Sequence, residues 1–297
     1  MTRYYLALIF LLSIFPVSGV YALDKNSNYK DFTSWYEARH KVESVPFRAA
    51  AVVEAGSLEP LYFHQETTVI PTASLIKLLT AGALVKLPVD WWSKLSYSQA
   101  DNETDLRQYV DAGDKFTLLK LQAGDSITAE HSLAAMLIGS ANNAANHFAS
   151  WLTSRSVYLE SMRQVAKEWG MKHTTVDDPS GLSLGNTTTA TDMANAICHA
   201  TDNFMIQYYA SRPSFTFVTA NGEKKTVSHT VHQLRATPKS FFGAKTGYLR
   251  ETGFHIAAGY ITPKGNRICA AILSTETRPI SEKALVEIGQ WVDEVYN

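Results

Sequence analysis

Strand patterns lie towards both ends of this 297-residue sequence, and helix patterns fill the part between them. Residues 47–54 and 61–63 form two apolar runs on either side of a Gly-Ser turn, which is typical of a β-hairpin. Strand patterns return at 241–245, 255–261 and 267–273. Because helices inserted between two groups of strands favour one sheet assembled from both ends of the chain, the sequence predicts an α/β (α+β) fold.

The middle of the sequence predicts helices that each have one apolar face. One helix follows Ala73, and Thr128 is a favourable N-cap for another. A helix that begins near residues 191–192 and a closing helix at about 281–295 complete the pattern. The apolar positions repeat at intervals of three and four residues, as in Leu75, Leu78 and Leu79, in Leu133, Met136 and Leu137, and in Ala145, Phe148, Ala149 and Leu152. We therefore expect an inserted all-helical subdomain, about residues 81–190, beside the sheet.

The N-terminus is typical of a signal peptide for export. Arg3 precedes an apolar run, residues 6–15, that ends at Pro16, and Ala22 offers a small residue for cleavage. The run is shorter than the roughly 20 residues that a membrane-spanning helix needs, so we favour cleavage over an uncleaved membrane anchor. The mature catalytic domain, 23–297, is then expected in the periplasm or outside the cell, with no stable membrane insertion.

Two classes of partner find no support in the sequence. The 27 Lys and Arg residues nearly balance the 28 Asp and Glu residues, whereas a nucleic-acid partner would need a clustered basic field. His229 and His232 have the spacing of metal ligands, but no third ligand follows in a recognisable pattern. We therefore predict no nucleic-acid partner, no metal and no cofactor.

The sequence contains two cysteines, Cys198 in a helical pattern and Cys269 in a strand pattern. Two cysteines are too few for a disulfide scaffold, although export would permit a single bond. We expect two buried free thiols, and neither cysteine is a candidate nucleophile.

The first candidate catalytic pair is Ser74 and Lys77. On a helix, positions i and i+3 share a face, so the lysine can reach the serine hydroxyl. A serine becomes a nucleophile when a base removes its proton, and a lysine serves as that base only when it is neutral. Burial or nearby positive charge must therefore lower the pKa of Lys77. Taken alone the S-x-x-K spacing is weak, because a solvated serine and lysine on a helix show it too.

Two further motifs follow in order. Ser140 and Asn142 lie between two predicted helices, where a serine can pass a proton and an asparagine can bind a substrate amide; a helix cap is the alternative interpretation. Lys245, Thr246 and Gly247 end a predicted strand. A lysine and a hydroxyl at a sheet edge can hold a carboxylate, and a glycine lets a bound peptide approach the backbone closely. A strand that runs into a turn is the alternative for this third motif.

The three motifs in this order are the element set of the penicillin-binding proteins and serine β-lactamases. Over residues 47–291 the sequence resembles the low-molecular-mass penicillin-binding proteins of the serine-type D-alanyl-D-alanine carboxypeptidase family. The resemblance implies an antiparallel sheet with flanking helices, and a peptidase that acts on the D-alanyl ends of peptidoglycan stem peptides. Further segments that resemble family signatures are 71–81, 137–146, 178–182, 189–192 and 243–247, with Gly253 at a matching spacing.

The resemblance also implies roles by position. Ser74 is expected to be acylated, Lys77 to act as its base, and Ser140 to shuttle a proton. Asn142 is expected to hold the substrate's amide. β-Lactam antibiotics are then expected to act as covalent inhibitors.

The third motif is expected to bind the end of the substrate. Lys245 and Thr246 would face the terminal carboxylate, and the backbone N–H of Tyr248 would join that of the nucleophile in an oxyanion hole. Arg278 is the first candidate for a carboxylate-binding arginine and Arg267 the second, with a solvated loop charge as the alternative for Arg278. The family commonly has a threonine two residues after this motif, where the chain has a leucine at position 249, so one substrate hydrogen bond is expected to be missing.

Three classes of function remain: a D,D-peptidase, a β-lactamase and a catalytically silent binder such as an antibiotic sensor. The commonest β-lactamases need a glutamate in an E-x-x-L-N element, and none occurs between Asn142 and Lys245. Glu160 and Glu168 lie in a helical pattern without that context. We therefore predict a serine D,D-carboxypeptidase that removes the terminal D-Ala. A D,D-endopeptidase that cuts D-alanyl cross-links is the alternative, and a serine β-lactamase is a further one.

Overall fold

The structure, a computed structural model, describes residues 31–97, 106–111, 113, 115–122 and 124–296. The predicted signal peptide lies outside the described residues. Among the helices of the described part, none is both long and apolar enough to cross a membrane.

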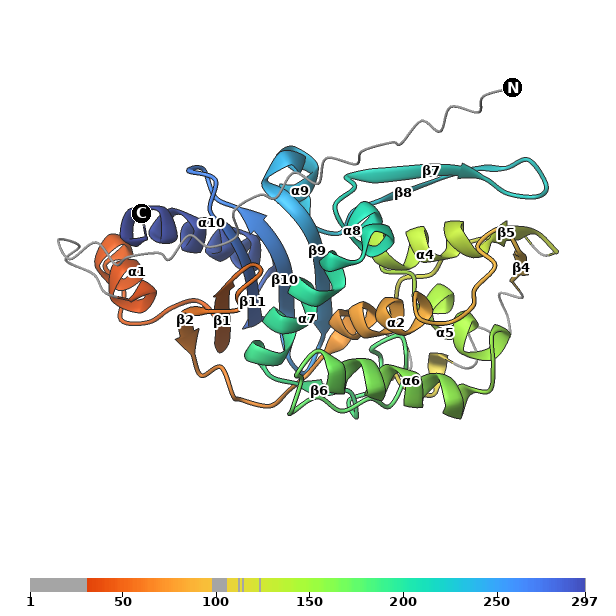
Figure 1. The fold of residues 1–297 in the computed structure, drawn as a ribbon, viewed down its shortest axis with the longest axis horizontal. Coiled ribbons are helices and arrows are strands. Elements are labelled where there is room, and N and C mark those ends of the chain that lie inside the picture. Colours follow the sequence, from red (N-terminus) through yellow and green to blue (C-terminus); the bar gives the residue numbers. More distant parts are fainter. Residues whose placement is uncertain (1–30, 98–105, 112, 114, 123, 297) are drawn as a thin grey trace, which may run out of the picture.

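A five-stranded antiparallel sheet forms the centre of the fold (Figure 1). Its strand order is β2-β1-β11-β10-β9, so the N-terminal hairpin pairs with the last strand of the chain. This arrangement confirms the predicted fold class, with one sheet built from both ends of the sequence. The strands are β1 (Ala49–Glu54), β2 (Pro60–His64), β9 (Phe241–Leu249), β10 (Gly253–Ile261) and β11 (Arg267–Thr275).

Side chains alternate between two cores, one on each face of the sheet. Ala49, Ala51 and Val53 of β1 belong to the core that includes helix α7 (Ala190–Asp202). Their neighbours Ala50 and Val52 belong to the second core. That core contains side chains of α1 (Phe32–His40) and α10 (Arg278–Val295). Because successive side chains of a strand point to opposite faces, the sheet packs against helices on both of its faces.

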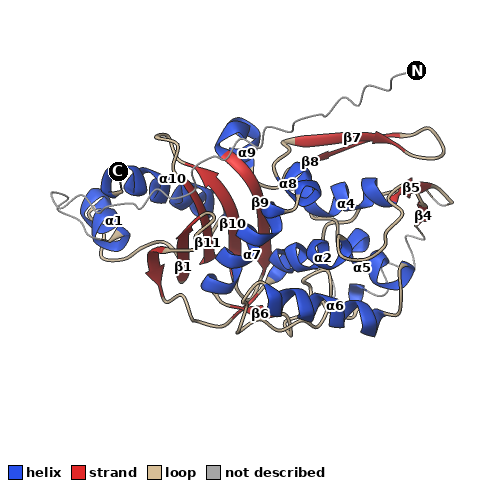
Figure 2. Cartoon of the chain, viewed as in Figure 1, coloured by secondary structure: helices blue, strands red, loops and turns tan. Residues whose placement is uncertain are grey.

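Except for α9 (His232–Ala236), whose Leu234 belongs to the second core, the remaining helices gather on one side of the sheet (Figure 2). Thr128 caps one of them, as predicted, by accepting a hydrogen bond from the backbone N–H of His131. These helices are α2 (Lys77–Leu84), α4 (Ala129–Ile138), α5 (Asn142–Trp151), α6 (Arg155–Glu168) and α8 (Phe204–Ala210). Three two-stranded ribbons join them: β3 (Ile70–Pro71) with β6 (Thr187–Thr188), β4 (Lys94–Ser96) with β5 (Ser126–Thr128), and β7 (Ser214–Val218) with β8 (Lys224–Ser228).

Several boundaries differ from the sequence expectation. Strand β9 continues four residues beyond Lys245, so the third motif lies inside the strand and not at its end. Helix α10 begins at Arg278, three residues earlier than expected, with Pro279 in its first turn. Helix α7 begins at Ala190 behind the N-cap Thr189. These shifts place the third motif on the edge strand of the sheet, and Arg278 on a helix and not in a loop.

The expectation of two free thiols was wrong, because Cys198 and Cys269 form a disulfide with their Cα atoms 5.7 Å apart. Cys198 lies on α7 and Cys269 on β11, and both belong to the same core. Odd-numbered residues of β11 face α7, so the two side chains meet where the helix crosses the strand. Which strand a helix crosses is a property of tertiary packing, which the spacing of two cysteines does not contain.

The disulfide closes a loop of 71 residues between α7 and β11. A cross-link of this length restricts the unfolded chain, so its loss should lower the free energy of unfolding by about 2–5 kcal/mol. Denaturant titration of the wild type with and without reductant measures this difference. The double variant Cys198→Ala/Cys269→Ala should have the same free energy of unfolding as the reduced wild type, and reductant should not change its unfolding curve. A wild-type unfolding curve that reductant leaves unchanged would contradict the expectation.

Candidate active site

Ser74 lies on a 3₁₀ turn, η1 (Ala73–Ile76), that leads directly into α2. Ala73 takes a left-handed backbone conformation, with φ 48°, at the point where the chain turns into the helix. Ser74 remains partly exposed, whereas Lys77 is fully buried. The amine of Lys77 lies 2.8 Å from the Ser74 hydroxyl oxygen, so the predicted pair at i and i+3 is in hydrogen-bond contact.

Lys77 has three oxygen partners in the core. Besides Ser74, its amine donates to Asn142 Oδ1 at 2.7 Å and to the backbone carbonyl of Ser180. Burial lowers the pKa of Lys77 from 10.5 to about 7, and the carboxylate of Asp178 acts in the opposite direction. A substantial fraction of the amine is therefore neutral near pH 7 and able to accept a proton.

A second serine–lysine pair faces the first. Ser140 sits between α4 and α5 in a left-handed conformation, with φ 61°, and its hydroxyl accepts a hydrogen bond of 2.7 Å from Lys245. Burial lowers the pKa of Lys245 well below its usual range, and the positive charges of Lys77 and Arg278 lower it further. The junction of the sheet and the helices thus holds two buried amines, each bonded to a serine hydroxyl.

The start of α5 fixes one wall of the site. The backbone N–H of Asn142 donates to the carbonyl of Thr117 at 2.8 Å. The side-chain amide of Asn143 bonds both backbone groups of Leu119, at 2.8 and 2.9 Å. The N-cap residue of α5 is Ala141, which makes no capping bond through a side chain. The helix-cap interpretation of the second motif is therefore wrong for this chain.

Two glycines allow the nucleophile turn to be packed closely. A Cβ on Gly247 would lie 2.9 Å from the Cβ of Ala73 and 3.2 Å from the backbone nitrogen of Ser74. A Cβ on Gly181 would lie 2.0 Å from the carbonyl oxygen of Ala73. We had expected Gly247 to make room for a bound peptide. The structure shows that it also makes room for the turn that carries Ser74.

Thr230, which the sequence analysis did not identify, joins Thr246 and Arg278 on one side of the cleft. Its hydroxyl accepts a hydrogen bond of 2.7 Å from Thr246, and its carbonyl accepts one of 3.3 Å from Arg278. Arg278 Nε is buried without a hydrogen-bond partner among the described residues. Arg267 instead stacks on the ring of Phe242, in a different pocket. Arg278 is therefore the arginine of this site, and the solvated-charge interpretation is wrong.

The structure brings all nine predicted site residues to one cleft of about 280 Å³. Seven of them line it, and Lys77 and Lys245 lie behind, bonded to Ser74 and Ser140. Leu249 is buried and is not part of the cleft lining. The described lining residues are Ser74, Lys115, Phe116, Thr117, Ser140, Asn142, Leu182, Thr230, Thr246, Gly247, Tyr248, Phe254 and Arg278.

The segment 178–182 has a function in the site that its sequence did not show. One carboxylate oxygen of Asp178 accepts hydrogen bonds from the backbone N–H groups of Ser180 and Gly181, and the other accepts one from Ser183. This network fixes the loop so that the Ser180 carbonyl points at Lys77. A backbone acceptor carries no residue-type signal, so the sequence could mark the segment only as structural.

The two histidines with metal-like spacing lie on either side of Val231, the N-cap residue of helix α9. His229 is buried, and its Nδ1 accepts a hydrogen bond from the backbone N–H of Val231. His232 begins helix α9. Across the described ranges, no group of three or more His, Cys, Asp or Glu side chains is placed to hold a metal ion.

The fold belongs to the class of the D,D-transpeptidases and penicillin-binding proteins. The structure of the Streptomyces K15 DD-transpeptidase superposes with a TM-score of 0.75 over 85% of this chain and 98% of its own, at 18% sequence identity. A structure of an evolved putative penicillin-binding protein homolog from Mycobacterium tuberculosis gives 0.69 over 84% and 93%, at 21% identity. Within this class, the chain belongs to the D-alanyl-D-alanine carboxypeptidase family, whose model matches residues 37–277.

The chain is similar to relatives named D-alanyl-D-alanine endopeptidase and to others named D-alanyl-D-alanine carboxypeptidase. A D-alanyl-D-alanine endopeptidase of Pseudomonas aeruginosa is 25% identical over 69% of this chain and 64% of its own length. The D-alanyl-D-alanine carboxypeptidase DacF of Bacillus subtilis is 24% identical over 80% of this chain and 60% of its own. The matched region thus spans less than two thirds of either relative.

The close contact between Gly181 and the turn that carries Ser74 should affect the free energy of unfolding when Gly181 is replaced. Gly181 (φ +88°) and Gly222 (φ +85°) have nearly the same φ, but a Cβ at Gly222 would have no atom within 4 Å. Gly222→Ala should lower the free energy of unfolding by about 1 kcal/mol, the cost of the left-handed conformation alone. Gly181→Ala adds the clash and should cost at least about 3 kcal/mol. Equal losses for the two variants in denaturant titration would show that the close approach is unimportant.

Proposed function

We propose that this protein is a serine D,D-peptidase that cleaves the D-alanyl-D-alanine end of peptidoglycan stem peptides through an acyl-enzyme on Ser74. The observation that carries the proposal is the buried amine of Lys77, which lies 2.8 Å from the Ser74 hydroxyl and has its pKa lowered to about 7. Removal of the terminal D-Ala, a carboxypeptidase reaction, is the principal activity that we propose.

Acylation begins when the neutral amine of Lys77 takes the Ser74 proton. The serine oxygen attacks the carbonyl carbon of the penultimate D-alanine, and the carbonyl electron pair moves onto its oxygen. We assign the stabilisation of this oxyanion to the backbone N–H groups of Ser74 and Tyr248, since donors aimed at developing charge lower the barrier most. Because Asn142 Oδ1 accepts from Lys77, its Nδ2 is the group that can donate to the substrate's amide carbonyl.

The intermediate collapses when the bond from the carbonyl carbon to the D-alanine nitrogen breaks. That nitrogen needs a proton to leave as an amine, and we assign its delivery to Ser140, which Lys77 reprotonates. The hydroxyl of Ser140 is held for this transfer by its hydrogen bond from Lys245. A water molecule then attacks the ester carbon and gives its proton to Lys77. The Ser74–carbon bond breaks, Lys77 returns its proton to the serine oxygen, and the shortened peptide leaves as a carboxylic acid that loses its proton to solvent.

The terminal carboxylate is assigned to Thr246, Lys245 and Arg278. Thr246 and Arg278 line the cleft and Lys245 is buried behind it, and Arg278 Nε has a buried hydrogen without an acceptor in the described structure. An anion at this position would satisfy that donor and offset the positive charge that lowers the pKa of Lys245. The cationic cleft therefore supports a substrate that ends in a free carboxylate.

A D,D-endopeptidase is the second candidate activity. The similarity to the Pseudomonas aeruginosa endopeptidase favours it, and the acylation chemistry is the same for both reactions. Digestion of purified muropeptides separates them. A carboxypeptidase releases D-alanine from pentapeptides, whereas an endopeptidase converts cross-linked dimers to monomers.

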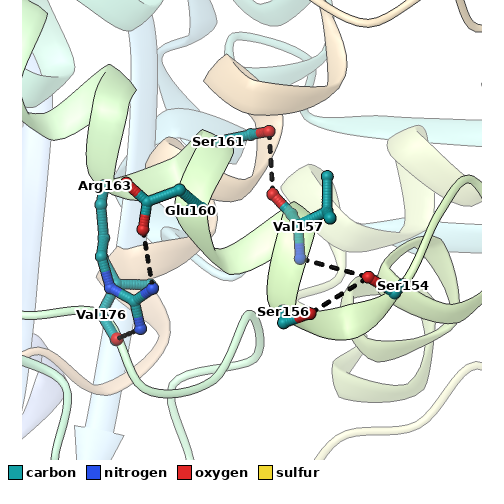
Figure 3. A network of polar contacts seen from close by, with 7 residues as sticks. All are labelled: Ser154, Ser156, Val157, Glu160, Ser161, Arg163 and Val176. Carbon is teal, nitrogen blue, oxygen red and sulfur yellow. Dashed lines mark hydrogen bonds and ion pairs between the residues drawn. The ribbon is translucent and has the colours of Figure 1, made fainter.

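The structure gives the β-lactamase alternative no support. Among the described residues that line the cleft there is no carboxylate to activate a deacylating water. Glu160 forms an ion pair with Arg163 on the exposed face of α6 (Figure 3), and Glu168 pairs with Lys86. An acyl-enzyme formed with a β-lactam should therefore be long-lived, so we propose β-lactams as covalent inhibitors.

We also propose that the protein is exported to the periplasm or secreted. The predicted signal peptide, residues 1–22, supports this location. The disulfide between Cys198 and Cys269 supports it further, because structural disulfides persist in oxidising compartments.

A fluorescent penicillin should label Ser74 covalently, and this is the direct test of the proposed function. Peptide mass mapping of the labelled protein identifies the residue. Ser74→Ala should abolish the label, while Ser161→Ala, on the exposed face of α6, should keep it. Label on another residue, or none on folded wild type, would refute the acyl-enzyme on Ser74.

Acylation should depend on pH through Lys77. Its pKa is lowered to about 7, so the amine is charged and inactive as a base below that value. The rate constant for acylation should fall about tenfold per pH unit below pH 7 and level off above it. Stopped-flow measurement with a fluorescent penicillin gives this profile. Lys77→Ala should be about 10²–10⁴ times slower. A flat wild-type profile from pH 5 to 9 would rule out a lysine base with this pKa.

A further inference from the structure

A cavity of about 190 Å³ opens beside the disulfide, apart from the catalytic cleft. Cys198 lines it, whereas Cys269 does not, and we call it the disulfide cavity. It shares no described lining residue with the cleft around Ser74. Besides Cys198, its described lining residues are Ala55, Gly56, Leu58, His199, Thr201, Asp202, Gln207, Phe242 and Arg267.

The two sulfur atoms differ in what can reach them. Cys269 lies on β11, in the middle of the sheet between β1 and β10, and is fully buried. Cys198 lies on α7 at the wall of the disulfide cavity and keeps 6% of its surface exposed. Thiol–disulfide exchange requires a thiolate to reach one sulfur and to displace the other. An incoming thiol can therefore attack Cys198, with Cys269 as the leaving group.

The disulfide cavity also offers a positive charge to an incoming anion. Arg267 and Cys269 are two residues apart on β11, so they point to the same face of the sheet, roughly 7 Å apart. The Arg267 guanidinium lies 4.1 Å from the centroid of the Phe242 ring. Asp202, which is the one carboxylate among the described lining residues, pairs with His199 at 3.7 Å. An anion in the cavity would therefore give Arg267 a partner of opposite charge.

We propose that the disulfide cavity binds a low-molecular-mass thiol that carries a carboxylate, and that this thiol exchanges with the disulfide at Cys198 while the protein is folded. The carboxylate pairs with Arg267, which places the thiolate at Cys198. Thiols of the cysteine and glutathione class have this chemistry. The inference does not depend on the proposed function, because the cavity and the cleft are separate.

The exchange has two steps. The thiolate attacks the Cys198 sulfur, a new sulfur–sulfur bond forms, and the bond to Cys269 breaks. Its electron pair moves to the Cys269 sulfur, which takes a proton from solvent. A second thiolate attacks the added sulfur, releases the oxidised small thiol and leaves Cys198 reduced. The result is the loss of the cross-link between α7 and β11.

The test compares three small thiols of opposite charge. In 3-mercaptopropionate, 2-mercaptoethanol and cysteamine, two methylene groups separate the sulfur from a carboxylate, a hydroxyl or an ammonium. The rate of disulfide opening in native buffer is divided by the thiolate concentration and by the rate with a neutral reference, 2-hydroxyethyl disulfide. One exposed ion pair should make 3-mercaptopropionate roughly threefold faster than 2-mercaptoethanol, with cysteamine the slowest. Equal corrected rates would overturn the inference.

A pair of variants assigns this preference to the cavity. Arg267→Gln removes the positive charge and keeps most of the side chain, so the preference for 3-mercaptopropionate should fall to near unity. Arg163→Gln removes an exposed positive charge on α6 (Figure 3) and should retain the preference. A preference that survives in Arg267→Gln would show that another group binds the carboxylate, which contradicts the proposed site.

The position of the first mixed disulfide tests which sulfur is attacked. Acid quenching of the wild type at early times, followed by peptide mass mapping, should place 3-mercaptopropionate on Cys198, and a probe on Cys269 would overturn the inference. Cys269→Ala and Cys198→Ala are matched controls, since each lacks the cross-link and keeps one thiol. The oxidised probe, 3,3′-dithiodipropionate, should modify Cys198 in the first variant about tenfold or more faster than Cys269 in the second.

The dependence on thiol concentration separates attack on the folded protein from attack after unfolding. The rate of disulfide opening should rise in proportion to the concentration of 3-mercaptopropionate. A rate that stays constant and equals the unfolding rate, measured by denaturant jump, would show that only the unfolded chain reacts. That result would overturn the inference and leave the proposed function intact, because penicillin labelling of Ser74 is a separate measurement.

Discussion

The loss of water around two amines governs the chemistry of this protein. Lys77 and Lys245 are fully buried, and an ammonium group in such a place costs several kcal/mol unless its pKa falls or polar partners surround it. Both amines obtain oxygen partners from segments that are distant in the sequence. Lys77 on α2 reaches the Ser180 carbonyl, and Lys245 on the sheet reaches Ser140 between two helices. The hydrogen bonds of both amines therefore depend on tertiary packing, and the bond of Lys245 depends on the packing of the sheet against the helical part.

The backbone of the site is strained in support of the same arrangement. Ala73 and Ser140 both have positive φ values, and a residue with a Cβ in this conformation costs about 1–2 kcal/mol. Ala73 directly precedes Ser74, and Ser140 itself carries a hydroxyl that we assign to catalysis. Gly181 and Gly247 press against the first of these turns, where any side chain would clash. The strain is therefore held in place by close packing, which fixes the position of Ser74.

Prediction from sequence succeeded where the geometry is local. Ser74 and Lys77 are one helical turn apart, so their contact follows from helix geometry, and the order of strands and helices was enough for the fold class. Thr230 could not be predicted as a site residue from the sequence, because its partners Thr246 and Arg278 lie 16 and 48 residues away and only tertiary packing brings them together. The early start of α10 was foreseeable, since Pro279 is typical of a first helical turn.

Helix α10 connects the core of the protein to the carboxylate side of the site. Its apolar face packs in the core on the far side of the sheet. Arg278 and Glu282, one turn apart, both bind the segment 230–233. Arg278 bonds the Thr230 carbonyl, and the Glu282 carboxylate accepts from the backbone N–H groups of His232 and Gln233 at 3.0 and 2.7 Å. Because this segment presents the Thr230 hydroxyl to Thr246, the packing of α10 sets the shape of the proposed carboxylate site. Changes in that core should therefore alter substrate binding before they alter the Ser74–Lys77 pair, which is held by the other core.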